Sequence, residues 1–123
     1  MIKSIGLDIV EINRIQKDIE KYGNRFIDKI LGPDELLVYN NRKDKPQFLS
    51  GRFAAKEAVI KALGVYLTNR PLLPELQILN DSTGQPSLHL PEKLKNIITD
   101  KCFISISHEK SVAAAVAIFS EEK

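Results

Sequence analysis

The stretch FLSGRFAAKEAVIKALG, residues 48–64, carries the clearest helical pattern in the chain. We predict a helix over residues 48–63, with Ser50 as its N-terminal cap and Gly64 just beyond its end, where glycine commonly terminates a helix. Its apolar surface is supplied by Phe53, Ala54, Ala58, Ile60, Ala62 and Leu63. The rest of the sequence can be interpreted outward from this helix.

Charged residues on this helix form the strongest chemical signal. Glu57 and Lys61 lie one turn apart on one face, and Arg52 and Lys56 lie one turn apart on the neighbouring stripe. A carboxylate surrounded by three cations suits a site for Mg²⁺ and phosphate, since Mg²⁺ takes oxygen ligands and cations hold phosphate charge. Spacing alone favours a plainer alternative, a solvated helix with ordinary Glu–Lys pairs.

Two further candidates lie at the ends of predicted strands. Residues 2–10 alternate in hydrophobicity, which predicts a half-buried strand. Its apolar face consists of Ile5, Leu7 and Ile9. Asp8 lies on the opposite face, where it could bind Mg²⁺ or cap the following helix. His108 ends a second alternating strand, residues 103–108, where it could donate to a phosphate or simply occupy a hairpin edge. The residues alone leave these alternatives open.

The remaining pattern predicts an α+β fold. Further helices are expected at residues 12–22, 26–31, 91–98 and from Pro33 onward. Further strands are expected at residues 76–79, 87–90 and 112–119. The turn at residues 81–84 joins two of these strands into a hairpin, which indicates antiparallel pairing. We therefore predict a single domain over residues 1–123, with a mostly antiparallel sheet packed against helices.

Composition limits the function classes. The chain has 123 residues, a net charge of +2 and one cysteine, Cys102, which is typical of a small domain in the reducing cytoplasm. The N-terminus does not resemble a signal peptide, and no apolar run is long enough to span a membrane. One cysteine and two distant histidines offer no zinc-ligand spacing. We expect a cytoplasmic protein without a membrane segment.

A basic ridge begins on the first predicted helix. It consists of Arg14, Lys17, Lys21 and Arg25. Such a ridge suits an acidic protein partner or nucleic acid, or is merely a solvated face. The few aromatic residues mostly occupy apolar-pattern positions, whereas an RNA-binding module is expected to expose aromatics among its basic residues. We therefore expect no nucleic acid as partner.

Three blocks of sequence together resemble the holo-acyl-carrier-protein synthase family, the small type of 4′-phosphopantetheinyl transferase. The blocks are IGLDIVE at residues 5–11 followed by Arg14-Ile15, residues 48–64, and ISISH at residues 104–108 with the alanine-rich strand after it. Their order and spacing span almost the whole chain, and the second block is the most specific. The resemblance implies the 4′-phosphopantetheinyl transferase fold and a transfer of phosphopantetheine from coenzyme A to a serine of acyl carrier protein.

The resemblance also implies roles for individual residues. Asp8 and Glu57 would hold Mg²⁺, and Glu57 and Lys61 would be the catalytic pair. The residues implied to contact coenzyme A are Phe48, Arg52, Lys56, Lys61, Gly64, Asn80, Gly84, Pro86 and His108. Those implied to face acyl carrier protein are Arg14, Lys21 and Arg25. The resemblance leaves the general base open, and our choice for the group that takes the serine proton is Glu57 or a metal-bound water that it orients.

The resemblance also implies an oligomeric assembly, and this sequence departs from the family pattern at two places. The family forms homotrimers with active sites between subunits, and the small side chains of the last strand suit close packing. Those side chains are Ala113, Ala114, Ala115 and Ala117. Residues 40–47 do not align cleanly, so the residue expected at the ribose 3′-phosphate is left open. The candidates are Arg42, Lys43 and Lys45. Glu109 places an unexpected acid directly after His108.

Overall fold

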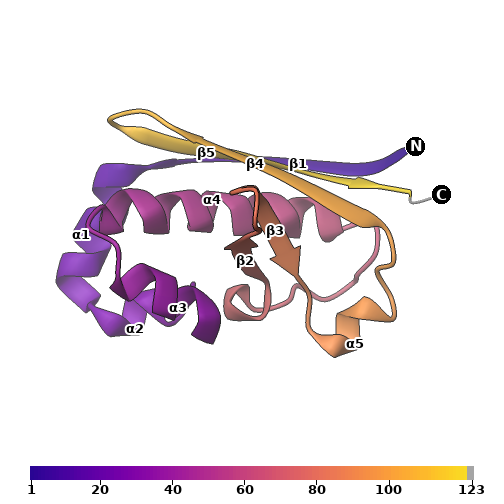
Figure 1. The fold of residues 1–123 in the computed structure, drawn as a ribbon, viewed down its shortest axis with the longest axis horizontal. Coiled ribbons are helices and arrows are strands. Elements are labelled where there is room, and N and C mark those ends of the chain that lie inside the picture. The colour runs from indigo at the N-terminus through magenta and orange to yellow at the C-terminus, as the bar shows by residue number, and fades with distance from the viewer. Residues whose placement is uncertain (122–123) are drawn as a thin grey trace.

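A computed structural model describes residues 1–121 and shows a sheet lying along one side of a long helix (Figure 1). Its helices are α1 (Ile12–Tyr22), α2 (Asn24–Ile27), α3 (Pro33–Asn40), α4 (Lys45–Leu63), the 3₁₀ helix η1 (Leu73–Glu75) and α5 (Glu92–Lys95). Its strands are β1 (Ile2–Glu11), β2 (Gln77–Asn80), β3 (Pro86–His89), β4 (Lys101–His108) and β5 (Val112–Ser120). No helix in this described part is both long and apolar enough to cross a membrane.

The strands pair antiparallel, as predicted, but they form two separate sheets. The larger sheet has the order β1-β5-β4, and the smaller is the hairpin of β2 and β3. In the larger sheet Asp8 pairs with Ala115 of the central strand, and Ala113 pairs with His108 on the other side. The predicted α+β class is therefore confirmed, with β1 and β4 at opposite edges of the larger sheet.

The helix α4 lies very close beneath the sheet. A Cβ atom placed on Gly6 of β1 would lie 1.9 Å from the carbonyl oxygen of Ala58, so only glycine fits there. Alanines with at most 2% exposure occur both on α4 and on the central strand β5. They are Ala54, Ala55, Ala58 and Ala62 of α4, and Ala113, Ala115 and Ala117 of β5. Close helix–sheet contact in this protein depends on small side chains.

This contact corrects two predictions about strand faces. The strand β1 was predicted to bury Ile5, Leu7 and Ile9, but these side chains are 62%, 65% and 66% exposed. Gly6 and Val10 point toward α4 instead, because the helix approaches too closely for large residues. Likewise, most of the alanines of β5 were predicted to suit packing between subunits, but they face α4 within one chain.

The start of α4 also differs from the prediction. The helix begins at Lys45 and carries Pro46 in its first turn, where proline is well tolerated. Ser50 is therefore inside the helix, and its hydroxyl donates to the carbonyl oxygen of Pro46 at 2.6 Å. It does not cap the helix. Its hydroxyl bonds the preceding turn, as serine commonly does inside helices.

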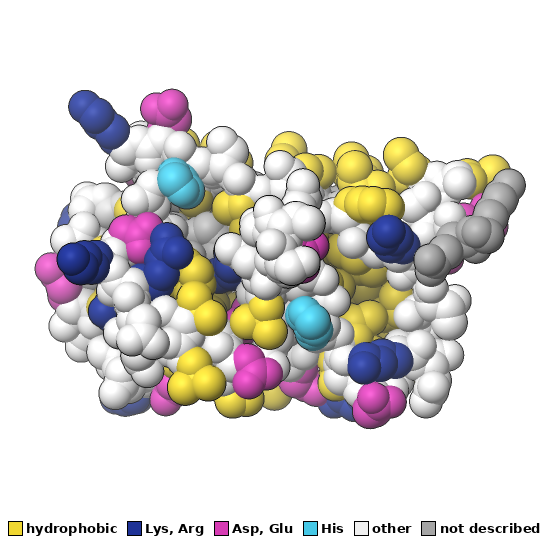
Figure 2. All heavy atoms as spheres, in the orientation of Figure 1, with side chains coloured by type: hydrophobic (Ala, Val, Ile, Leu, Met, Phe, Trp, Pro, Cys, Tyr) yellow, Lys and Arg dark blue, Asp and Glu magenta, His cyan; other side chains and the backbone are white. Residues whose placement is uncertain are grey.

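The outer face of the larger sheet is apolar and has no covering element within residues 1–121. Ile118 of the central strand β5 pairs with Ile5 on one side and with Phe103 on the other, and Leu7 pairs with Val116. Figure 2 shows hydrophobic side chains projecting along this side, above the sheet drawn in Figure 1. A contiguous apolar surface of this kind is typical of a protein–protein interface.

The close contact predicts the effect of enlarging Gly6. Gly6→Ala should lower the free energy of unfolding by about 3 kcal/mol or more, because the added methyl group overlaps the backbone of α4. Gly64→Ala is the matched control, since its Cβ would lie 3.5 Å from the carbonyl oxygen of Lys61, an ordinary contact. Urea denaturation of both variants measures the difference. Equal stability of the two would contradict the close packing.

Candidate functional site

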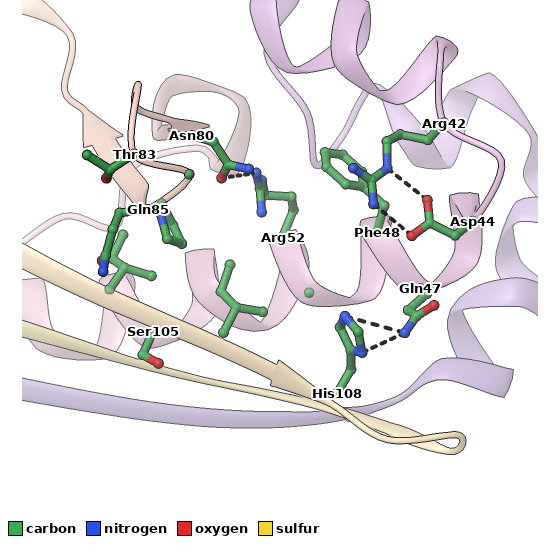
Figure 3. Close-up of a pocket in the computed structure, with 15 residues that line it drawn as sticks. Arg42, Asp44, Gln47, Phe48, Arg52, Asn80, Thr83, Gln85, Ser105 and His108 are labelled. Carbon is green, nitrogen blue, oxygen red and sulfur yellow. Dashed lines mark hydrogen bonds and ion pairs between the residues drawn. The ribbon is translucent and has the colours of Figure 1, made fainter.

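A pocket of about 570 Å³ lies between the β2–β3 hairpin, α4 and β4. It is lined by six of the nine residues predicted to contact coenzyme A. These six are Phe48, Arg52, Asn80, Gly84, Pro86 and His108. Figure 3 labels four of them, Phe48, Arg52, Asn80 and His108, which come from α4, the hairpin and the end of β4. The structure therefore brings most of the predicted ligand contacts together.

Arg52 organises the centre of this pocket. Its side chain is buried, its Nε donates to the carbonyl oxygen of Ile78 at 3.0 Å, and its Nη2 donates to Oδ1 of Asn80 at 3.1 Å. Its guanidinium also stacks over the ring of Phe48, 4.6 Å from the centroid. A planar cation fixed in this way presents its remaining N–H donors in a defined direction, which suits phosphate or a base edge.

Two further residues line this pocket: Arg42, one of the three open candidates for the 3′-phosphate, in the loop before α4, and Gln47, which was not predicted, in the first turn of α4. Arg42 lines the pocket, its guanidinium also lies over the ring of Phe48 at 4.9 Å from the centroid, and it pairs with Asp44 at 2.7 Å. Hydrogen bonding to Arg42 holds the pKa of Asp44 below its usual range. Gln47 hydrogen-bonds the His108 ring, with its Nε2 2.5 Å from Nδ1. Their closeness to Phe48 in the sequence was the one signal that could have identified Arg42 and Gln47 as pocket residues.

Lys56 contradicts its predicted role. Its side chain is 0% exposed, and its ammonium donates to Glu35, at 2.5 Å, and to the carbonyl oxygens of Ile30 and Leu73. Burial lowers the pKa of Lys56, and the neighbouring carboxylate of Glu35 partly offsets this effect. An enclosed ammonium with three protein acceptors cannot reach a diphosphate. Glu35, a fully buried acid three residues after Gly32, was missed because its partner lies on a distant element.

Glu57 and Asp8 lie on the other side of α4. The carboxylate of Asp8 accepts from the ammonium of Lys61 at 3.1 Å, and Lys61 lies one turn after Glu57 on the helix. Glu57 itself is paired with Arg70, at 2.6 Å, rather than ringed by the cations of its own helix. Arg70, in the loop after α4, is a further contact that the spacing of helical residues could not reveal.

The two groups of residues therefore occupy opposite edges of one chain. Arg52 and Glu57 are separated by about 140° around the axis of α4. Asp8 belongs to the edge strand β1, His108 belongs to the edge strand β4, and β5 lies between them. Gly64 lies outside the main pocket and lines a smaller one, of about 160 Å³, together with Arg70. One chain thus presents the two groups of predicted site residues at separate places.

The carboxylates of Asp8 and Glu57 suit Mg²⁺ by their chemistry. Both side chains are partly exposed, at 18% and 20%, and both already attract a cation. Among residues 1–121 there is no cluster of three or more His, Cys, Asp or Glu side chains that could enclose a metal ion. A site with two carboxylates instead leaves coordination positions for water and phosphate oxygens, which is the usual arrangement for Mg²⁺.

The basic ridge is exposed as predicted on α1 and α2. Arg14, Lys17 and Lys21 project from α1, while Ile12 and Ile15 of the same helix are buried. Arg25 on α2 is also exposed. None of the four basic side chains forms an ion pair with another residue in the described part of the chain, so their charge remains available to a partner.

A family model described as the 4′-phosphopantetheinyl transferase superfamily matches residues 4–117. The chain belongs to this superfamily. Within it, the chain is 42% identical over 121 residues to the holo-[acyl-carrier-protein] synthase of Protochlamydia amoebophila, covering 98% of this chain and 99% of that protein. It is 38% identical over 128 residues to the synthase of Orientia tsutsugamushi strain Boryong, covering 98% of each. The resemblance inferred from the three sequence blocks is confirmed.

Solved structures confirm the transferase fold. Holo-[acyl-carrier-protein] synthase from Neisseria meningitidis superimposes with a TM-score of 0.89 at 31% identity, covering 98% of this chain and 100% of that one. The synthase from Bacillus anthracis, in complex with CoA (3′,5′-ADP), has a TM-score of 0.82 at 34% identity, with 99% of each chain covered. That from Helicobacter pylori, in complex with coenzyme A, has a TM-score of 0.82 at 32% identity, covering 94% and 99%.

Proposed function

We propose that this chain transfers 4′-phosphopantetheine from coenzyme A to a serine of apo-acyl carrier protein, releasing adenosine 3′,5′-bisphosphate. The observation that carries the proposal is the convergence of six predicted coenzyme A contacts on one polar pocket, in a chain of this superfamily. Loading the carrier in this way supports fatty acid biosynthesis. The single cysteine fits a cytoplasmic location for the enzyme.

The pocket offers a distinct place for the nucleotide of coenzyme A. Arg52, Phe48 and Asn80 supply a fixed cation, an aromatic face and an amide, which suit the base and phosphates together. Of the three basic candidates for the 3′-phosphate, Arg42 is favoured because it lines the pocket. The ammonium of Lys45 instead donates to the carbonyl oxygen of Arg42 at 2.6 Å.

The reaction is a displacement at phosphorus, in which positioning and charge stabilisation dominate. Asp8 and Glu57 would hold Mg²⁺, which supplies neutralisation of the diphosphate when bound. Lys61 would stabilise charge on the diphosphate oxygens, since its ammonium already lies beside Asp8. Glu57 would accept the proton of the attacking serine hydroxyl. The serine oxygen then forms a bond to phosphorus as the bond to adenosine 3′,5′-bisphosphate breaks.

A complete active site requires a second subunit, and we propose a homotrimer. The nucleotide pocket lies at the β4 edge of the sheet and the carboxylates lie at the β1 edge. Joining unlike edges of neighbouring chains is a heterologous contact, which closes into a ring when the rotation allows. The exposed apolar face around Ile5, Leu7 and Ile9 supplies surface that such an assembly would bury.

The basic ridge is the proposed docking surface for acyl carrier protein. Acyl carrier protein is acidic, and exposed cations without internal partners would steer it toward the enzyme. Arg14, Lys21 and Arg25 lie at the surface of α1 and α2. They are close in sequence to β1, whose last residue precedes α1 directly, so docking there brings the carrier near the Asp8 edge.

Glu57→Gln tests the assignment of the carboxylate. We expect turnover to fall at least about a hundredfold, because the variant loses the proposed base and a metal ligand. The thermal midpoint should barely change, since the Glu57–Arg70 pair lies at the surface with both side chains partly exposed, and such pairs contribute little to stability. The measurement is the Mg²⁺-dependent gain in mass of apo-acyl carrier protein with coenzyme A. Glu92→Gln, which changes an exposed acid on α5, is the control. Normal turnover by folded Glu57→Gln would refute the assignment.

Subunit complementation tests the shared active site. Glu57→Gln removes the carboxylate half-site, and the double variant Asn80→Ala/His108→Ala removes part of the pocket half-site. Each should be inactive alone, whereas refolded equal mixtures should recover about a quarter of wild-type activity, the fraction of interfaces that join two intact halves in a random ring. Sedimentation should show trimers throughout. A mixture that stays inactive, or an active monomer, would overturn the proposed assembly.

Arg14→Glu tests the docking surface. We expect the KM for acyl carrier protein to rise about tenfold or more while the KM for coenzyme A is unchanged, because a rim charge mainly steers the partner. The effect should shrink as salt concentration increases. Lys95→Glu on α5 makes the same charge reversal at an exposed position away from the ridge and serves as the control. Equal effects of the two variants would argue against the ridge.

A further inference from the structure

The buried ion pair between Lys56 and Glu35 has no part in the proposed chemistry, although Lys56 lies one helical turn after the pocket residue Arg52. Both side chains are 0% exposed. The three protons of the Lys56 ammonium are matched by three acceptors, namely Glu35 and the carbonyl oxygens of Ile30 and Leu73. The ammonium therefore ties α4 to two distant segments and has no donor left for a ligand.

Glu35 extends this network to the β2–β3 hairpin. Its Oε1 also accepts from the backbone N–H of Gly32 at 2.9 Å, and its Oε2 accepts from the backbone N–H of Ile78 at 2.8 Å. The carbonyl oxygen of Ile78 in turn accepts from Arg52, which also holds Asn80. Both backbone polar groups of Ile78 are thus bound by charged side chains that belong to α3 and α4.

The hairpin needs such external support. Among the described strands, β2 and β3 pair with each other and stay outside the larger sheet. An isolated two-stranded hairpin is marginally stable at best, so its place relative to α4 has to come from other contacts. A buried ion pair is a weak source of net stability, because desolvation of both charges offsets their attraction. Its directional hydrogen bonds are better suited to fixing geometry.

We propose that Lys56 and Glu35 are positioning residues for the coenzyme A pocket. Their ion pair holds Ile78 in place, so that Asn80, Gly84 and Pro86 form the pocket wall before the nucleotide binds. The ligand named here rests on the proposed function, whereas the positioning of the hairpin does not depend on it. A wall formed in advance raises affinity, because binding then orders less of the protein.

Residue-level hydrogen exchange and binding calorimetry test the proposal together. In the wild-type protein without coenzyme A, the amide of Ile78 should exchange as slowly as the buried amides of α4. In the double variant Glu35→Gln/Lys56→Met, which removes both charges and keeps similar volume, the amide of Ile78 should exchange at least about tenfold faster while that of Val116 in β5 is unchanged. Coenzyme A should bind about tenfold more weakly. The KM for acyl carrier protein should stay within about twofold of wild type.

A matched control is the surface pair Glu75–Lys93, whose ion pair lies at 2.5 Å with 25% and 67% exposed side chains. The variant Glu75→Gln/Lys93→Met makes the same chemical changes and should leave both exchange and coenzyme A affinity unaltered. Unchanged Ile78 exchange and coenzyme A affinity in folded Glu35→Gln/Lys56→Met would overturn the proposal.

If the double variant fails to fold, the hydrogen-exchange rate of the Ile78 amide in the wild-type protein tests the positioning role. An Ile78 amide that exchanges like an unprotected loop would refute the positioning role, and a protected one would support it. If wild-type protein shows the protected Ile78 amide but does not bind coenzyme A, the proposed function fails while the positioning of the hairpin stands.

Discussion

The close contact between α4 and the sheet is the constraint on which the rest of the structure depends. Gly6 lets the backbone of β1 approach the carbonyl of Ala58, and buried alanines let β5 approach the same helix. With the sheet on one side, the flanks of α4 are directed to opposite edges. One flank carries Phe48 and Arg52, and the other carries Glu57 and Lys61. A single helix therefore supplies both halves of the proposed chemistry and keeps them apart.

This division explains why neighbouring residues in the most specific sequence block have unrelated environments. Lys56 and Glu57 are adjacent in the chain, but successive residues of a helix point about 100° apart. Lys56 is enclosed with Glu35, whereas Glu57 is partly exposed beside Arg70. Treating the block as one ring of charge around Glu57 was therefore wrong for Lys56 and Arg52, whose partners come from α3 and the hairpin. Helical spacing shows which residues share a face of the helix. Only the tertiary contacts show which other elements that face packs against.

Much of the fold was predictable from local pattern, and the remainder depended on distant contacts. Alternation located β1 and β4, and the turn at residues 81–84 located the hairpin. Alternation in β1 could not show which face is buried, because the larger residues Ile5, Leu7 and Ile9 suggested the reverse. The start of α4 was missed since a proline in the first turn resembles a loop signal. Arg42 stayed one of three open candidates and Arg70 was not assigned, because loops lack a period that places their side chains, and Gln47 was missed because the first turn of α4 was interpreted as loop.

The reversed face of β1 bears on the assembly as well as on the fold. A strand that buries Gly6 and exposes Ile5, Leu7 and Ile9 would be unfavourable in a protein that works as a lone chain, because its apolar surface would remain in water. The same strand carries Asp8 on its inner face, at the edge opposite the nucleotide pocket. In the proposed trimer, neighbouring subunits would cover this outer face and join the carboxylates of one chain to the pocket of the next, so both features would follow from the same packing of β1 against α4. The small residues that let α4 approach the sheet leave the large ones on the outer face, where the proposed neighbouring subunit would bury them.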